Sequence, residues 1–199
     1  MKKGALNLAV LISGSGSNLQ ALIDACESPD YPAQIQLVVS SRPDAYGLER
    51  AQKAGIPAFT VDHKAFTGRA EFEEALQEKL AQYPIDLICL AGFMRILTAD
   101  FVSKWPDKII NTHPSLLPKF GGEGMYGEHV HAAVLNAGET QSGASIHYVI
   151  PEVDQGPVIL QRPVSVHPDD TAETLSARVI AEEHIAYPEA VKKIAQERT

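Results

Sequence analysis

The sequence alternates between short apolar runs and amphipathic stretches, and this alternation limits the fold more than any other feature. Strand-like runs occupy residues 6–13, 34–41, 56–62, 85–92 and 108–113. Helical patterns lie between them, at residues 17–27, 45–55, 69–83 and 98–105. Strands that alternate with helices form parallel sheets, because each helix returns the chain to the starting edge by a right-handed crossover.

Two of these runs, Ala9–Ile12 and Leu87–Leu90, are continuously apolar, as in strands covered by helices on both faces. Residues 144–166 instead indicate two strands joined by a turn, with no helix between them. We therefore expect a doubly wound α/β fold in one domain, residues 1–199. Its central sheet is mostly parallel, with a Rossmann-like N-terminal half and antiparallel strands near the C-terminal end. A last helix should run from an N-cap at Thr171 to about Gln196, without the acid of a full capping box at Thr174.

The charge balance argues against a nucleic-acid partner. The formal net charge is −8 and the isoelectric point is near 5.3, whereas phosphate backbones are bound by excess lysine and arginine. No stretch approaches the roughly 20 apolar residues of a membrane span, so no membrane partner is expected. Cys26 and Cys89 lie in apolar segments and indicate buried thiols. A cytoplasmic enzyme is the expected class.

The loop after the first strand, Gly14–Asn18, has the composition of an anion-binding loop. Ligands of such sheets bind beyond the carboxyl ends of the strands, where backbone N–H groups at a helix N-terminus can face a phosphate. The loop is not a dinucleotide fingerprint, because Leu19 replaces the third glycine and no acid ends the second strand. A tight turn in which Ser17 caps the helix is the alternative.

The fifth strand ends in Asn111-Thr112-His113-Pro114, so the Asn111 and His113 side chains should leave one face of the strand. An amide that can donate and an imidazole that can move a proton suit a reaction through a tetrahedral carbonyl adduct. Such a histidine needs a carboxylate to orient it, and Asp154, in a turn bounded by glycine and proline, is the leading candidate. A structural role for His113 and an ordinary turn role for Asp154 remain alternatives.

The other histidines give weaker signals. His129 and His131 are spaced like metal ligands, but the sequence offers no cysteine or carboxylate cluster beside them, so no metal is expected. His147 lies within an expected strand, His184 on the last helix, and His63 and His167 in solvated positions. No serine or cysteine lies in a nucleophile elbow, so covalent acyl catalysis is not supported.

Four motifs occur in the order found in the folate-dependent phosphoribosylglycinamide formyltransferases, and the chain resembles this family from Leu8 to about Pro188. The motifs are LISGSGSNLQALIDA, AGFMRIL, NTHPSLLPKF and VDQGPVILQ. The resemblance implies the formyltransferase fold and a step of purine biosynthesis. The amine of glycinamide ribonucleotide attacks the formyl carbon of 10-formyltetrahydrofolate directly. Asn111 then holds the oxyanion, and His113, kept protonated by Asp154, helps pass a proton to the leaving folate nitrogen.

Further roles follow from the resemblance alone. Gly16, Ser17 and Asn18 would bind the phosphate of the ribonucleotide, and Glu183 would bind its ribose. The segment that lines the folate pocket corresponds to Met94, Arg95, Ile96 and Leu97, joined by Asn111 and, near the folate tail, Arg69. The co-substrate 10-formyltetrahydrofolate is the one cofactor implied, with no metal, and the enzyme is expected to be a monomer or a homodimer.

The chain departs from the family after Pro118, where the segment KFGGEGMYGEHVH is several residues longer and carries four glycines between Lys119 and Glu128. Its glycine content suggests a lid that orders when substrate binds. This departure leaves the substrate contacts of the segment open, including any role for His129 or His131.

Three other functions share some of these features. Methionyl-tRNA formyltransferases add a basic C-terminal domain that is not expected in this acidic chain. A 10-formyltetrahydrofolate hydrolase, which uses water as the acceptor, usually carries an N-terminal regulatory domain and has no use for a phosphate loop. A non-catalytic binding module for folate or a phosphate ligand would not need Asn111, His113 and Asp154 together. The hydrolase and the binding module are retained as alternatives.

Overall fold

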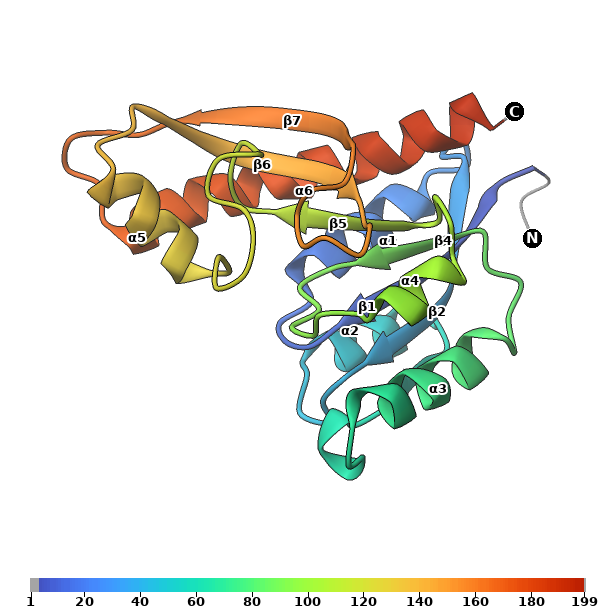
Figure 1. Cartoon of the computed structure of the whole chain (residues 1–199). Coiled ribbons are helices and arrows are strands. Elements are labelled where there is room, and N and C mark those ends of the chain that lie inside the picture. The colour runs from blue at the N-terminus through green and yellow to red at the C-terminus, as the bar shows by residue number, and fades with distance from the viewer. Residues whose placement is uncertain (1–3, 199) are drawn as a thin grey trace.

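The computed structural model describes residues 4–198 and contains a seven-stranded sheet with helices on both faces (Figure 1). The strands are β1 Leu6–Ile12, β2 Ala33–Ser40, β3 Ala58–Thr60, β4 Leu87–Leu90, β5 Ile109–His113, β6 Gln141–Tyr148 and β7 Val158–Ser165. The helices are α1 Ser17–Glu27, α2 Gly47–Lys53, α3 Arg69–Leu80, α4 Ala99–Ser103, α5 Glu128–Asn136 and α6 Ala172–Glu197, with a 3₁₀ turn, η1, at His63–Ala65.

The strand order is β3-β2-β1-β4-β5-β6-β7. The pairs among β1 to β5 are parallel, and β6 and β7 are added antiparallel at the other edge. The expected fold class is therefore confirmed. The third strand is shorter than expected at both ends; it begins late because Pro57, which cannot donate to a ladder, precedes β3 at the sheet edge.

Two apolar layers hold the sheet. Alternate β1 residues such as Leu8 and Val10 pack with α1, α2 and α6 on one face, while Ala9 and Leu11 pack with α3 and α4 on the other. This explains the continuously apolar strands, since each side chain of a strand covered on both faces is buried. A third cluster joins α5 to β6, β7 and the first half of α6, at the left of Figure 1.

Two helix caps differ from the sequence expectation. The N-cap of α1 is Gly16, in the left-handed region at φ 70°, and Ser17 is the first helical residue, so Ser17 does not cap this helix. At α6 the expected N-cap, Thr171, is confirmed, but the capping box is complete. The Thr174 hydroxyl accepts from the Thr171 backbone N–H at 3.0 Å and so replaces the usual acid.

The carboxyl ends of β1, β4 and β5 lie side by side because these strands are neighbours in the sheet. The chain reverses its strand order between β1 and β4, and such a switch point leaves a crevice for ligands in open α/β sheets. Among residues 4–198, none of the helices is long and apolar enough to cross a bilayer.

Candidate active site

A hydrogen bond connects the loop that follows β1 to the loop that follows β4. The Ser13 hydroxyl accepts from the backbone N–H of Met94 at 2.8 Å and shares a 2.7 Å hydrogen bond with the Ser41 hydroxyl. Ser13 and Ser41 are both buried, so the junction is fixed from within the protein. The first glycine loop and the expected folate segment therefore meet at the carboxyl ends of the central strands β1 and β4.

Strand β5 presents its last residues to two different faces. Thr112 donates from its hydroxyl to Glu183 Oε1 at 2.8 Å, on the α6 side of the sheet. Asn111 and His113 leave the opposite face, because successive side chains of a strand alternate. Asn111 lies opposite His147 of β6 in the antiparallel ladder, and its Nδ2 is 3.3 Å from His147 Nε2.

The expected pair of His113 and Asp154 is brought together. Asp154 lies in the turn between β6 and β7, in the left-handed region at φ 57°, and its Oδ2 is 3.4 Å from His113 Nδ1. The same oxygen accepts from the Gly122 backbone N–H at 3.0 Å. The other ring nitrogen of His113, Nε2, donates to the Phe120 carbonyl at 2.7 Å. Each ring nitrogen thus faces an acceptor, an arrangement that suits a protonated imidazole.

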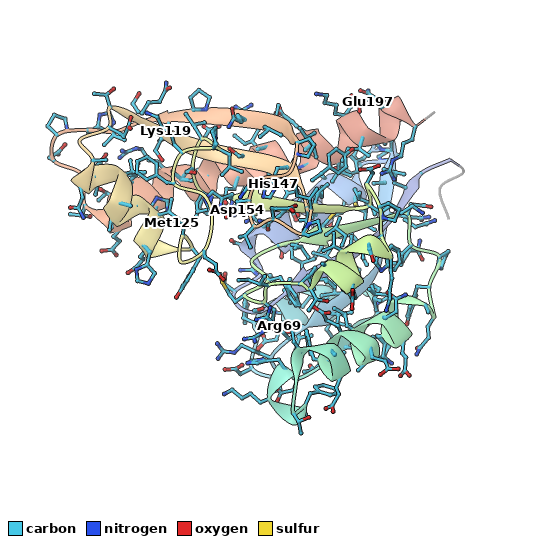
Figure 2. All side chains as sticks on the ribbon, viewed as in Figure 1. Arg69, Lys119, Met125, His147, Asp154 and Glu197 are labelled. Atoms are coloured by element: carbon cyan, nitrogen blue, oxygen red, sulfur yellow. The ribbon has the colours of Figure 1, made fainter. Side chains whose placement is uncertain are left out.

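His147 completes this cluster, although its sequence position alone gave it little weight. It is 1% exposed, and its Nε2 lies 3.6 Å from Asp154 Oδ1 (Figure 2). Its Nδ1 contacts the Tyr148 carbonyl at 2.9 Å, and a carbonyl can only accept, so Nδ1 carries the proton. Burial lowers the pKa of His147, which favours the neutral ring. A neutral ring leaves Nε2 free to accept from Asn111 and so fixes the orientation of that amide.

Glu183 of α6 lies between the glycine loop and β5. It is 6% exposed and accepts from Asn18 Nδ2 at 3.2 Å as well as from Thr112. Burial raises the pKa of Glu183, and the two hydrogen bonds oppose this shift. Thr112 was not expected at the site. The strand alternation around Asn111 places it on the other face, but the sequence does not say which helix covers that face.

The glycine loop leads directly into the N-terminus of α1. Gly16 takes a left-handed conformation as N-cap, and the first intrahelical bond of α1 runs from Gln20 N to Gly16 O at 2.9 Å. The preceding N–H groups of a helix, here those of Ser17 and Asn18, have no partner within the helix. They can therefore face a ligand at the positive end of the helix dipole.

The expected folate residues lie in the turn between β4 and α4. Met94 and Ile96 are 58% and 45% exposed, which is unusual for such large apolar side chains and leaves them open to a ring. Arg95 is exposed as well, whereas the Leu97 side chain packs in the core beside Phe93 and Phe101. Arg69 is exposed at the start of α3, apart from Asp154 in Figure 2.

A hollow of about 500 Å³ adjoins the Asp154 turn. It is lined by Leu117, Pro118, Gly121, Gly122, Val153, Asp154, Gln155, Gly156 and Val158. The long glycine segment thus forms one wall of the space beside the His113 pair.

The two histidines of α5, His129 and His131, lie on different faces of the helix. His129 is exposed and meets the Tyr126 ring edge to face, while His131 is buried and its Nδ1 has no hydrogen-bond partner among residues 4–198. Burial lowers the pKa of His131. Within residues 4–198, no three His, Cys, Asp or Glu side chains are grouped closely enough to hold a metal ion.

Comparisons with known proteins identify the family of the chain. A family model described as formyl transferase matches residues 6–191. The chain is 43% identical over 193 residues to the phosphoribosylglycinamide formyltransferase of Escherichia coli K12, which covers 97% of this chain and 89% of that protein. It is 48% identical over 188 residues to the trifunctional purine biosynthetic protein adenosine-3 of Bos taurus. That match covers 94% of this chain but only 18% of the longer protein.

Solved structures give the same result. The crystal structure of glycinamide ribonucleotide transformylase 1 from Symbiobacterium toebii matches with a TM-score of 0.92 at 44% identity, covering 98% of this chain and 90% of that one. With a family model that spans most of its length and a relative that it matches almost from end to end, the chain belongs to the formyl transferase family.

Proposed function

We propose that the chain transfers the formyl group of 10-formyltetrahydrofolate to the amine of glycinamide ribonucleotide, a step of de novo purine biosynthesis. The products are formylglycinamide ribonucleotide and tetrahydrofolate. The observation that carries the proposal is the joined cluster of Asn111, His113, Asp154 and His147 at the carboxyl end of β5, beside an anion loop. The nearly full-length similarity to the Escherichia coli enzyme of that name supports it.

In the proposed reaction the substrate amine attacks the formyl carbon, and a new C–N bond forms before the bond to the folate nitrogen breaks. Negative charge develops on the formyl oxygen in the tetrahedral adduct. Asn111 Nδ2, with one hydrogen directed to His147, has a second hydrogen to donate to that oxygen. A proton leaves the attacking amine and a proton reaches the folate nitrogen, so no acyl-enzyme is required.

His113 is the proposed proton carrier, with Asp154 stabilising its protonated form. His113 Nδ1 faces Asp154, so Nε2 is the nitrogen that can exchange with the reacting groups. That nitrogen donates to the Phe120 carbonyl at 2.7 Å. Proton transfer through Nε2 therefore requires the Phe120 carbonyl to release it, which gives the glycine segment a part in the reaction.

The substrates would bind on either side of this cluster. Backbone N–H groups of Gly16, Ser17 and Asn18 would hold the ribonucleotide phosphate, and Glu183 would accept from the ribose hydroxyls. The folate ring would lie against the exposed side chains of Met94 and Ile96, with the backbone of residues 94–97 on its polar edge.

The residues assigned to these roles all come from one chain, so the proposal holds for a monomer or a homodimer. In it, both substrates meet in a single domain, and the reaction takes place in the cytoplasm without a metal ion.

The test follows the absorbance of a 10-formyl folate analogue mixed with the protein, with and without glycinamide ribonucleotide. Deformylation should depend on the ribonucleotide and be lost in His113→Ala. The exposed His167 lies between β7 and α6, and His167→Ala is the matched control that should keep wild-type turnover. Equal deformylation without the ribonucleotide would indicate a hydrolase, and no deformylation at all would favour a binding module.

A further inference from the structure

The back of the glycine loop is held by helix α2, which the proposed reaction does not otherwise use. The Gly47 backbone N–H donates to the Gly14 carbonyl at 3.1 Å, and Arg50 Nε donates to the Ser15 carbonyl at 2.8 Å. A Cβ atom on Gly16 would lie 2.6 Å from Gly47 Cα, so the two backbones are in direct contact. Three successive residues of the loop therefore touch the first turn of α2.

These contacts set the direction of the loop's N–H groups. In a trans peptide the carbonyl and the N–H of the same plane point in opposite directions, and peptides that do not precede proline are trans. Because Arg50 holds the Ser15 carbonyl, the Gly16 N–H points away from α2. The contact of Gly47 with the Gly14 carbonyl has the same effect on the Ser15 N–H. Arg50 thus acts on an N–H that the proposed function assigns to the phosphate.

Arg50 is itself fixed from two sides. Its Nη1 donates to Gln20 Oε1 on α1 at 3.2 Å, so one guanidinium spans the glycine loop and the helix that follows it. Its Cζ lies 4.9 Å from the centre of the Tyr46 ring, within the range of a cation–π contact. The planar guanidinium can hold both acceptors at once, whereas a lysine ammonium on a flexible stem cannot fix the same geometry.

We infer that Arg50 is a positioning residue for the phosphate of the ribonucleotide substrate. It contacts the loop from behind and orients the Gly16 N–H before the substrate arrives, so the donors need not reorganise on binding. The inference rests on the proposed function, since it takes the loop as the phosphate site. It adds a residue of α2 whose loss should weaken the binding of the ribonucleotide and leave the binding of the formyl folate unchanged.

The test measures the Michaelis constants for both substrates and kcat in three variants. Arg50→Met should raise KM for glycinamide ribonucleotide by about 10-fold, the usual effect of losing a hydrogen bond from a charged donor. Neither kcat nor KM for the formyl folate should change by more than about 3-fold, because the Asn111 and His113 cluster is untouched. Arg50→Lys should restore part of the affinity, since it regains one donor to Ser15.

Lys53→Met is the matched control. Lys53 lies one turn further along α2, 5.5 Å from the same Tyr46 ring, and pairs with Glu49 at 3.8 Å. It carries the same charge as Arg50, and its removal should leave KM for the ribonucleotide at the wild-type value. If Arg50→Met fails to fold, Tyr46→Leu replaces it. The Tyr46 side chain is 45% exposed, and losing the ring under the guanidinium should raise the same KM by a smaller factor.

The outcomes separate the inference from the proposed function. An active wild type whose KM for the ribonucleotide does not change in Arg50→Met, or in Tyr46→Leu where that replaces it, overturns the inference alone. A parallel loss of kcat and of both affinities also overturns it, since that pattern indicates a merely structural role. A wild type without ribonucleotide-dependent turnover overturns the proposed function, and the assignment of Arg50 fails with it.

Discussion

Asp154 links three parts of the candidate site. One carboxylate faces His113 through Oδ2 and His147 through Oδ1, and it accepts from the Gly122 N–H. The hydrogen bond to Gly122 needs only an oxygen, whereas the pairing with a protonated His113 needs the negative charge. A substitution that keeps the shape and removes the charge therefore separates the two roles.

Asp154→Asn should lower kcat by roughly 10²-fold to 10³-fold, because His113 loses the charge that stabilises its protonated form. The dissociation constant for a folate analogue should change by less than about 3-fold, since the amide oxygen still accepts from Gly122. Steady-state kinetics and fluorescence titration measure the two quantities. A variant that keeps wild-type kcat would remove Asp154 from the mechanism.

Some residues of the site could be predicted from the sequence, and others could not. The spacing of Asn111 and His113 places both on one strand face, and the geometry agrees. His147 looks like an ordinary strand residue, because its partnership with Asn111 depends on the register between β5 and β6, which no local pattern encodes. Glu183 has no local signal either, and only the family resemblance pointed to it.

The segment between β5 and α5 contributes to the site as an element. Gly121 packs so tightly that an added Cβ would lie 2.6 Å from Leu117 Cδ2 and 3.2 Å from Asp154 Cβ. The neighbouring Phe120 holds His113 Nε2, and Gly122 holds Asp154. Three consecutive residues of this segment thus fix the positions of the two candidate catalytic groups.

Gly121→Ala should displace the Asp154 turn, with about a 10-fold loss of kcat if the misplacement is well below 1 Å. The overpacking should also cost about 1–3 kcal/mol of unfolding free energy. Chemical denaturation and steady-state kinetics test both effects. Glu123→Ala, two residues further on and exposed, is the matched control. Equal kinetics for the two variants would show that the contact at Gly121 is not needed for turnover.

The same segment is expected to act as a lid. The glycines leave its backbone adaptable, and the Phe120 carbonyl must release His113 before the ring can serve the substrates. Amide hydrogen exchange of residues 121–127 should therefore slow when both substrate analogues are bound. Exchange that stays unchanged on binding would end the lid hypothesis.

Secondary structure elements could be read from the sequence with few errors. Helix α1 has the expected bounds, because an amphipathic pattern of three turns sets both ends. Helix α5, Glu128–Asn136, has no counterpart among the predicted helices, and the other errors lie at the ends of elements: β3 begins only after Pro57, and a second threonine replaces the acid in the capping box of α6. Such ends depend on one or two hydrogen bonds rather than on a repeating pattern.

At the scale of the whole molecule, buried and half-buried histidines should make stability depend on pH. Burial lowers the pKa values of His131, His147 and His184 from an ordinary value of 6.5. The unfolded chain then binds more protons than the folded chain below pH 6.5, so the free energy of unfolding falls as the pH falls. Burial raises the pKa of Glu183 and acts in the opposite direction above pH 4.5, but the hydrogen bonds from Thr112 and Asn18 reduce this effect.

The melting temperature should therefore be level between about pH 6.5 and 8, below the range where buried thiols and phenols titrate, and decline between about pH 6.5 and 5. His131→Leu removes one of the three titrating rings and should make that decline shallower. Differential scanning calorimetry across this range measures both slopes. A melting temperature that is constant or rises on acidification would contradict the assignment of neutral buried rings.

The overall architecture was predictable because it depends on patterns that extend over many residues. The β-α alternation gives the parallel sheet, and its loss after Ala144 marks the change to antiparallel strands β6 and β7. The contact between α2 and the glycine loop was not predictable in this way. It depends on the approach of two glycine backbones, Gly16 and Gly47, which leaves no periodic signal in the sequence.

The central claim is that the formyl group passes directly to the ribonucleotide at the carboxyl end of β5. A single turnover with a formyl folate carrying a ¹³C label in the formyl group, followed by mass spectrometry of the products, tests it most directly. The proposal predicts that the label is found in formylglycinamide ribonucleotide, with neither labelled formate nor a labelled protein. Label recovered as formate while the ribonucleotide remains unmodified would contradict it.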